Sequence, residues 1–279
     1  MSDIAEPHSA PGARQVFALA WPMAIKAIFL HGTIVIDGWL VSSLGEASLA
    51  AMGLAAAIGG IVLGVIFAFS HAMQIRTAQA SGTDDAVYLK STLASGLVIS
   101  LSIGLIGIAA LFLAGRPLID VFAPSREVAA NAWSYLSVFS LVILFESVGQ
   151  CLSSYFNGRG RTRLPLYGYC LSVPINITAS VALIHGLWGL PAYGVAGAAM
   201  GSALGVGVQV AFFATCLWYH DRALSQVAGW RQGRFAPTVR RHLTFALPIA
   251  ATFVSAPLAT HVCTLIYARM TLSDFAAMT

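Results

Sequence analysis

Asp37 is the residue of this sequence with the clearest potential for chemistry, because it is the only acid in a long apolar stretch, residues 16–42. An ionised carboxylate is costly in hydrocarbon, so an acid in such a stretch normally faces a bundle interior or a water-filled cavity and marks an ion pathway. There it can exchange a proton or bind a cation. Thr33 lies one helical turn earlier, and we expect it to line a substrate cavity. The alternative for Asp37 is a structural acid that ties two helices together.

Lys26 lies in the same stretch, eleven residues before Asp37. In a helix that separation is about 16 Å along the axis, so Lys26 is not expected to contact Asp37. We expect its side chain to extend to the cytoplasmic interface of the membrane.

Asn176 follows Pro174 by two residues in another apolar stretch. A proline inside a helix removes the hydrogen bond to the carbonyl of residue i−4, here Cys170. We therefore expect a kink toward the interior, with Pro174 at the substrate cavity and Asn176 near Asp37. Amide and free carbonyl oxygens suit a cation, so Asp37 and Asn176 are candidate ligands of Na⁺. Hydrogen bonding between helices is the alternative.

Glu146 interrupts a further apolar stretch, and Gln150 lies one turn later on the same helix face, close enough to hydrogen-bond it. We expect Glu146 to be a second titratable group and Gln150 to line the substrate cavity. The alternative is a carboxyl that Gln150 keeps neutral, or one that is exposed near a helix bend.

The composition indicates that membrane-spanning helices position these residues. Apolar residues make up 58% of the 279 residues and charged residues only 9%, compared with about 25% charged residues in soluble domains. A span needs about 20 mostly apolar residues, and the apolar runs here are too long for strands and do not alternate. We predict an all-α polytopic membrane protein. Its seven spans are expected at residues 16–42, 50–75, 91–115, 132–155, 165–188, 193–218 and 244–268.

The basic residues and an internal repeat predict the organisation of the chain. Eleven Lys and Arg residues fall on the side of the N-terminus and three on the opposite side, so the N-terminus should be cytoplasmic. Pro22 matches Pro248 at an offset of 226, and residues 50–52 match 276–278, which suggests two parallel repeats and a truncated chain. The expected parts are a cytoplasmic segment 1–15, a six-helix lobe 16–218, a cytoplasmic linker 219–243 and the first helix of a second lobe, 244–279.

Three stretches carry a resemblance to a known family. The first is WPMAIKAIFLHGTIVIDGWLVSSLGEASLAAMGLA, which has Pro22, Asp37 fifteen residues later, and then LG and LAAMG. The second is RTAQASGTDDA, and the third combines FNGRGRTRLP with PINITASVALIHGLWGLPAYGVAGAAMGSALG. Together they resemble the multidrug and toxic compound extrusion (MATE) family over nearly the whole chain, most specifically in the glycine-rich stretch 186–201.

The resemblance implies two six-helix lobes that alternate in access and export amphiphilic or cationic organic compounds in exchange for H⁺ or Na⁺. Ser202 takes a place where the family often has Thr. Ser180 stands where one branch has an Asp, one turn after Asn176, and Glu146 is an acid where the family usually has an apolar residue. We therefore expect Asp37, Asn176, Ser180, Ser202 and Glu146 to take part in cation or proton coupling.

Other functions have less support. A lipid-linked saccharide flippase of the same superfamily would need several basic residues in its cavity, and only Lys26 lies within a predicted span. No P-loop, nucleophile elbow or metalloprotease helix is visible, so we expect neither an enzyme nor ATP-driven transport, and no cofactor besides the coupling ion. The basic residues lie in short loops rather than on one face, which argues against nucleic acid. An inactive truncated fragment is the remaining alternative.

The expected partners are small organic substrates, the lipid bilayer, and either the missing second lobe or a second copy of the chain. The expected location is the inner membrane of a bacterium.

Overall fold

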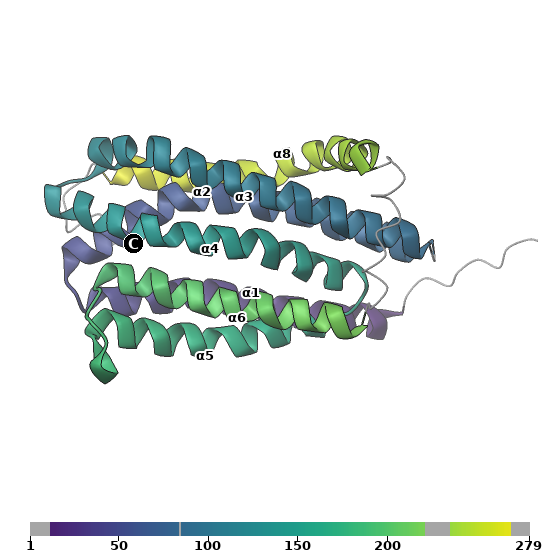
Figure 1. Cartoon of the computed structure of the whole chain (residues 1–279), viewed down its shortest axis with the longest axis horizontal. Helices are drawn as coiled ribbons and strands as arrows, with labels where there is room; N and C mark the ends of the chain where they lie inside the picture. The colour runs from purple at the N-terminus through teal and green to yellow at the C-terminus, as the bar shows by residue number, and fades with distance from the viewer. Residues whose placement is uncertain (1–11, 84, 221–234, 269–279) are drawn as a thin grey trace, which may run out of the picture.

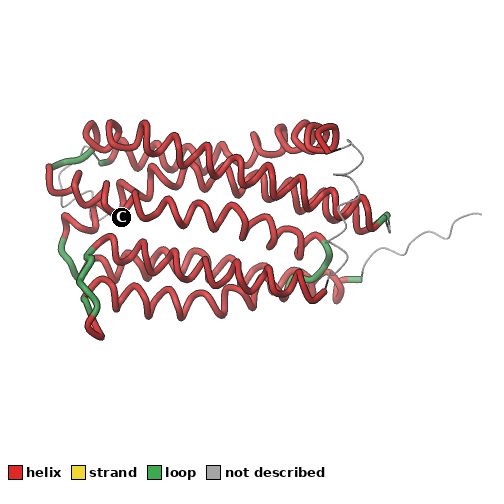
Figure 2. The backbone as a smooth tube through the Cα atoms, viewed as in Figure 1, coloured by secondary structure: helices red, strands yellow, loops and turns green. Residues whose placement is uncertain are grey.

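The structure is a computed structural model that describes residues 12–83, 85–220 and 235–268, and within these residues it contains helices but no strand (Figure 1, Figure 2). Seven helices are long and apolar enough to cross a membrane, which confirms the predicted all-α membrane fold. These helices are α1 (Ala13–Ser42), α2 (Glu46–Ser81), α3 (Ala86–Phe122), α4 (Arg126–Gly158), α5 (Arg163–His185), α6 (Val195–His220) and α8 (Phe235–Tyr267). A short 3₁₀ helix, η1 (Leu187–Gly189), lies between α5 and α6.

Each helix overlaps the apolar stretch that predicted it, and most extend beyond it because polar residues can continue a helix past the hydrocarbon. The start of α3 shows how such an end is fixed, since the Asp85 side chain accepts hydrogen bonds from the N–H groups of Val87 and Tyr88, both at 2.9 Å. Helix α8 begins at Phe235, inside the segment 219–243 that we expected to be a linker. The division into lobe, linker and second lobe stays a prediction, and parts of it (1–11, 221–234 and 269–279) lie outside the described residues.

Helices α2 and α4 form the centre of the bundle, and small residues let them approach closely. The ring of Phe139 in α4 lies directly against Gly59 of α2. Ser70 of α2 donates a hydrogen bond to the backbone carbonyl of Gln150 in α4 at 2.9 Å. Figure 1 shows α4 between α3 and α8 on its upper side and α5 and α6 on its lower side.

Helices α5 and α6 pack almost backbone to backbone, because a row of glycines on α6 leaves no room for side chains between them. A Cβ atom added at Gly197, Gly201 or Gly205 would lie within about 3 Å of atoms in α5. Small residues at every fourth position are a common way for membrane helices to approach closely. The close contact brings the polar side chains of the two helices within hydrogen-bonding distance of each other.

Candidate functional site

Three of the predicted site residues form one hydrogen-bonded chain that joins three helices. Ser202 of α6 donates a hydrogen bond from Oγ to Oδ2 of Asp37 in α1 at 2.8 Å. Asn176 of α5 donates from Nδ2 to the same Ser202 Oγ at 2.9 Å. Ser202 therefore accepts from Asn176 and donates to Asp37. The contacts confirm that Asn176 lies next to Asp37, whereas the role of these residues in coupling stays a prediction.

This chain is buried, and two of its oxygen atoms lack a hydrogen-bond partner. The exposed fraction is 6% for Asp37, 3% for Asn176 and 9% for Ser202. Neither Oδ1 of Asp37 nor Oδ1 of Asn176 has a partner. A buried acceptor without a partner costs about 1–3 kcal/mol, so native proteins rarely keep one without a reason such as an ion or water that binds there. The site can therefore offer two further oxygens to a proton or a cation.

The glycine row of α6 explains why Ser202 reaches this position. Gly201 and Gly205 flank Ser202 in sequence, and Gly205 lies so close to α5 that an added Cβ would be 2.9 Å from the Cβ of Asn176. With larger residues at these places α6 would stand further from α5, and the hydrogen bond between Asn176 and Ser202 would lengthen or break. Local sequence thus sets the distance on which the site depends.

Ser180, a predicted coupling residue, does not join this chain. Its Oγ atom donates to the backbone carbonyl of Ala198 in α6 at 3.4 Å, a weak contact between helices. Ser180 is fully buried against α6. This contact is of the kind that the alternative describes, hydrogen bonding between helices, and a role of Ser180 in coupling stays a prediction.

The expectation that Pro174 lies toward the interior of the lobe is wrong, because the Pro174 side chain is exposed and that of Asn176 is buried. The place of Pro174 at a substrate cavity stays a prediction. Two residues correspond to about 200° around a helix, so the two side chains must point to nearly opposite sides. Helix α5 also continues through Pro174 as one element from Arg163 to His185. Thr33, the other predicted cavity residue on these helices, donates its hydroxyl to the Phe29 carbonyl of its own helix at 2.8 Å, and its contact with substrate stays a prediction.

Glu146 and Gln150 belong to a second buried polar cluster. Gln150 donates from Nε2 to Oε2 of Glu146 at 2.7 Å, which confirms the predicted hydrogen bond, and it also contacts the Tyr169 hydroxyl of α5 at 3.1 Å. Both Glu146 and Gln150 are buried. The alternative of a Glu146 carboxyl exposed near a helix bend is therefore excluded, and its role as a second titratable group stays a prediction.

The expectation that Lys26 extends to the membrane interface is wrong. Its Nζ atom donates a hydrogen bond to Oγ of Ser153 in α4 at 2.7 Å and lies 5.5 Å from the centre of the Tyr169 ring. Glu146 belongs to the same cluster, since Gln150 bonds both to Glu146 and to Tyr169. Lys26 is held at this position because α4 supplies a hydroxyl and α5 an aromatic face.

Sequence reasoning missed most of this second cluster. Ser153 lies seven residues after Glu146 and thus on the same face of α4, a spacing that could have indicated it. Gln209, a buried residue of α6 beside Tyr169, had no such signal, because a single amide in an apolar helix is common.

The donor set around Asp37 is one carboxyl, one hydroxyl and one amide, all of them hard oxygen ligands. Within the described ranges, no three His, Cys, Asp or Glu side chains come together as they do in a transition-metal site. A donor set of this kind can exchange a proton or hold a hard cation such as Na⁺, and which of the two it does stays a prediction.

Comparison with known proteins assigns the chain to a family. The MatE family model matches residues 22–182, which include α2 to α4, nearly all of α5 and the part of α1 that holds Asp37. The chain is 25% identical over 253 residues to "Probable multidrug resistance protein NorM" of Chromobacterium violaceum, covering 86% of the chain and 52% of that protein. It is 27% identical over 258 residues to the protein of the same name in Bradyrhizobium diazoefficiens, covering 91% and 54%.

The fold agrees with this assignment. A solved structure described as the inward-facing conformation of a multidrug resistance MATE family transporter superposes with a TM-score of 0.77 at 19% sequence identity, over 95% of this chain and 59% of that one. The chain spans about half the length of the curated relatives that it matches. With the family model matched over more than half of the residues and the helical architecture shared, the chain belongs to the MatE family.

Proposed function

We propose that this chain is part of a secondary antiporter of the membrane that exports amphiphilic or cationic organic compounds in exchange for H⁺ or Na⁺. The observation that carries the proposal is the chain Asn176–Ser202–Asp37, with two oxygens that have no partner, buried within a bundle of helices long enough to cross a membrane. An acid kept in such a place at a cost in free energy is typical of an ion pathway. The names of the two bacterial relatives, which describe multidrug resistance, support the cargo class.

The proposed coupling step takes place at the Asp37 carboxyl. With a proton bound, Asp37 is neutral, holds no cation, and still accepts the hydrogen bond from Ser202 at Oδ2. With a cation bound, Oδ1 of Asp37 and Oδ1 of Asn176 both face the ion, and Ser202 holds the two side chains at a fixed distance. Coupling then requires that the ion and the organic substrate favour different states of the transporter, since a ligand shifts an equilibrium only by its difference in affinity.

Alternating access requires a second half to move against this one. The matched relatives are about twice as long, so we propose that a further lobe or a second copy of the chain completes the transporter. The proposed location is the bacterial inner membrane, with the N-terminus on the cytoplasmic side because the loops on that side carry most of the basic residues.

Transport is tested with inverted membrane vesicles from cells that express the gene, with the fluorescent cation ethidium as probe and imposed proton or sodium gradients in turn. Asp37→Asn keeps the size of the side chain but can neither exchange a proton nor offer a full negative charge, so exchange should stop under both gradients. Ser140→Ala, a buried change in α4 whose hydroxyl donates to the Ser137 carbonyl of its own helix, is the control and should keep exchange. Transport by Asp37→Asn at the wild-type rate under both gradients would make Asp37 structural and direct attention to Glu146.

The proposed orientation is tested by labelling in whole cells with a maleimide that does not cross membranes, after the native cysteines are replaced by alanine. Thr83→Cys, between α2 and α3, should be protected, whereas Pro124→Cys, between α3 and α4, should react. Both positions are exposed. The reverse pattern would place the N-terminus outside.

A further inference from the structure

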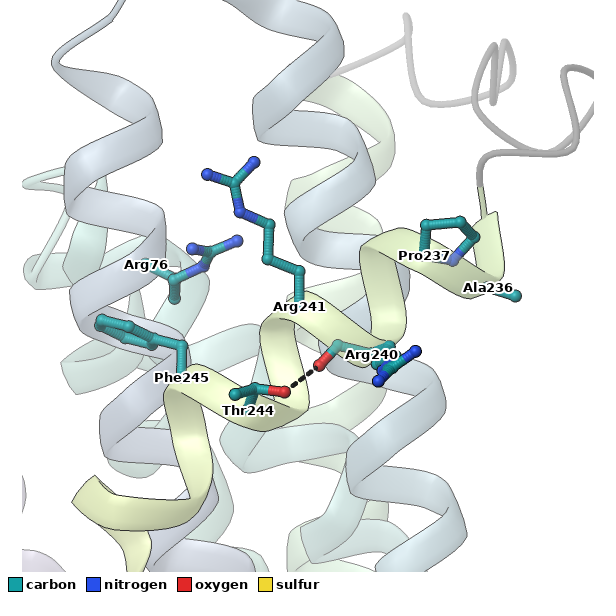
Figure 3. Close-up of a pocket in the computed structure, with 7 residues that line it drawn as sticks. All are labelled: Arg76, Ala236, Pro237, Arg240, Arg241, Thr244 and Phe245. Atoms are coloured by element: carbon teal, nitrogen blue, oxygen red, sulfur yellow. Dashed lines mark hydrogen bonds between the residues drawn. The ribbon is translucent and has the colours of Figure 1, made fainter.

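A basic pocket lies where α2 ends and α8 begins, away from both polar clusters described above (Figure 3). It has a volume of about 800 Å³ and opens to the surface. Three arginines line it together with smaller and apolar side chains: Arg76, Arg240, Arg241, Pro237, Thr244 and Phe245. Positive charge at this end of the bundle agrees with the predicted orientation, but neither that rule nor the proposed antiport accounts for a buried arginine among these residues.

Arg76 of α2 is the buried member of this group. Only 7% of it is exposed, and its Nε atom has no hydrogen-bond partner. Its guanidinium stands over the Tyr88 ring at 5.5 Å and over the Phe245 ring at 5.2 Å. Aromatic faces offset part of the cost of a buried charge, but they leave the Nε–H donor of Arg76 without a partner.

No carboxylate within the described residues neutralises this charge. The ion pair that these residues do contain, Arg116 with Asp120 at 3.6 Å, belongs to α3 at the opposite end of the bundle. A guanidinium is a planar fork of donors that matches the oxygens of a phosphate or carboxylate group. Arg76 therefore lacks the kind of partner that a buried arginine normally has.

Helix α8 supplies further positive potential to the same pocket. Arg241 is exposed and extends from α8 toward the side of the pocket where Arg76 lies (Figure 3). Pro237, Arg240 and Arg241 belong to the first two turns of α8. The first N–H groups of a helix have no intrahelical partner and carry the positive end of the helix dipole, which favours an anion there.

We propose that this pocket binds a phosphate-bearing anion, held by Arg76 from α2 and Arg241 from α8. Two sources share this chemistry, the headgroup of an acidic phospholipid and free phosphate. The place of the pocket at the helix ends, where headgroups lie, and its mixed lining of arginine and apolar side chains suit the lipid. The bound group would connect α8 to α2 and so stabilise α8 against the rest of the bundle.

The experiment measures the affinity of the purified chain for each source separately. In the first arm, native mass spectrometry follows phosphatidylglycerol or phosphatidylcholine added to the detergent-solubilised protein. In the second arm, the thermal unfolding midpoint is followed against inorganic phosphate, with chloride at matched ionic strength. Arg241→Gln is the main variant, because an exposed side chain can be changed without disturbing packing. Arg126→Gln, an equal loss of charge at an exposed position at the other end of the bundle, is its control.

Wild-type protein should prefer phosphatidylglycerol, and each arginine removed should weaken that binding about fivefold, with Arg126→Gln unchanged. Arg76→Gln should weaken the binding of phosphatidylglycerol at least as much. If Arg76→Gln does not fold, the result for Arg241→Gln tests the proposal by itself. A dependence on phosphate with no preference between lipids supports the same pocket with free phosphate as its ligand. If Arg241→Gln and Arg126→Gln bind phosphatidylglycerol equally well and show the same dependence of the unfolding midpoint on phosphate, the proposal is overturned.

Discussion

Replacement of Ser202 by alanine tests the hydrogen-bonded chain at its centre. The change removes the donor to Oδ2 of Asp37 at 2.8 Å and the acceptor for Nδ2 of Asn176 at 2.9 Å. It removes one oxygen from a buried position and leaves both neighbouring side chains without that partner. The backbone and the glycine row of α6 are unaffected, so the expected effect comes from the two hydrogen bonds alone.

The magnitude follows from what such bonds contribute inside membranes. In water-soluble proteins a buried group left unsatisfied costs about 1–3 kcal/mol. Side-chain hydrogen bonds between membrane helices average about 0.6 kcal/mol, with a maximum near 1.7, because the unfolded chain in the membrane also finds partners. For two such bonds we expect Ser202→Ala to lower the free energy of unfolding by about 1–2 kcal/mol.

The assay is reversible unfolding in mixed micelles, with the same substitution at Ser180 as the matched control. Ser180 is also buried and also faces a neighbouring helix, but its one hydrogen bond is 3.4 Å long. Ser180→Ala should therefore cost no more than about 0.5 kcal/mol. Ser202→Thr keeps the hydroxyl and should restore most of the loss. Equal costs for Ser202→Ala and Ser180→Ala would refute the reasoning, because the chain through Ser202 would then contribute nothing.

Two further predictions concern packing and the second polar cluster. Gly201→Ala places a Cβ 2.7 Å from the Cα of Ser180, so overpacking should destabilise the protein by about 1–3 kcal/mol. Gly207→Ala, whose nearest neighbour would be an aromatic carbon at 3.5 Å, should be neutral or stabilising, and a similar loss at both glycines would contradict the close α5–α6 contact. In a double-mutant cycle of Lys26→Met and Glu146→Gln, the double variant should lose less stability than the sum of the single variants, by about 0.5–3 kcal/mol. Strict additivity in the same unfolding assay would show that the two charges do not interact.

The membrane fold could be predicted from the sequence because a span leaves a strong compositional signal. The ends of the helices were harder to predict from the sequence. The apolar stretch of α3 is 91–115, whereas the helix runs from Ala86, which Asp85 caps, to Phe122. Helix propensity and capping continue a helix outside the hydrocarbon, and hydropathy does not report on them.

The candidate site was predictable in part, for a physical reason. Asp37 and Asn176 are polar side chains in apolar helices, so each needs a polar partner inside the bundle. Two such side chains are therefore expected to lie close together. The family resemblance indicated Ser202 as a site residue but not its bridge between Asn176 and Asp37, because nothing in the spacing places α6 next to both α1 and α5. Lys26 and Pro174 were misplaced for the same reason, because the direction of a side chain depends on which helices pack around its own.

The dependence of stability on the coupling ion tests the central claim most directly. The free energy of unfolding of the purified chain is measured against Na⁺, with K⁺ replacing it at constant ionic strength, and against pH, in the wild type and in Asp37→Asn. An ion that binds only the folded state stabilises it by about 2.7 kcal/mol at one hundred times its dissociation constant. The wild type should respond to Na⁺ or to pH, and Asp37→Asn should lose that response. If the free energy of unfolding of Asp37→Asn depends on Na⁺ and on pH in the same way as that of the wild type, the assignment of Asp37 as the coupling acid is contradicted.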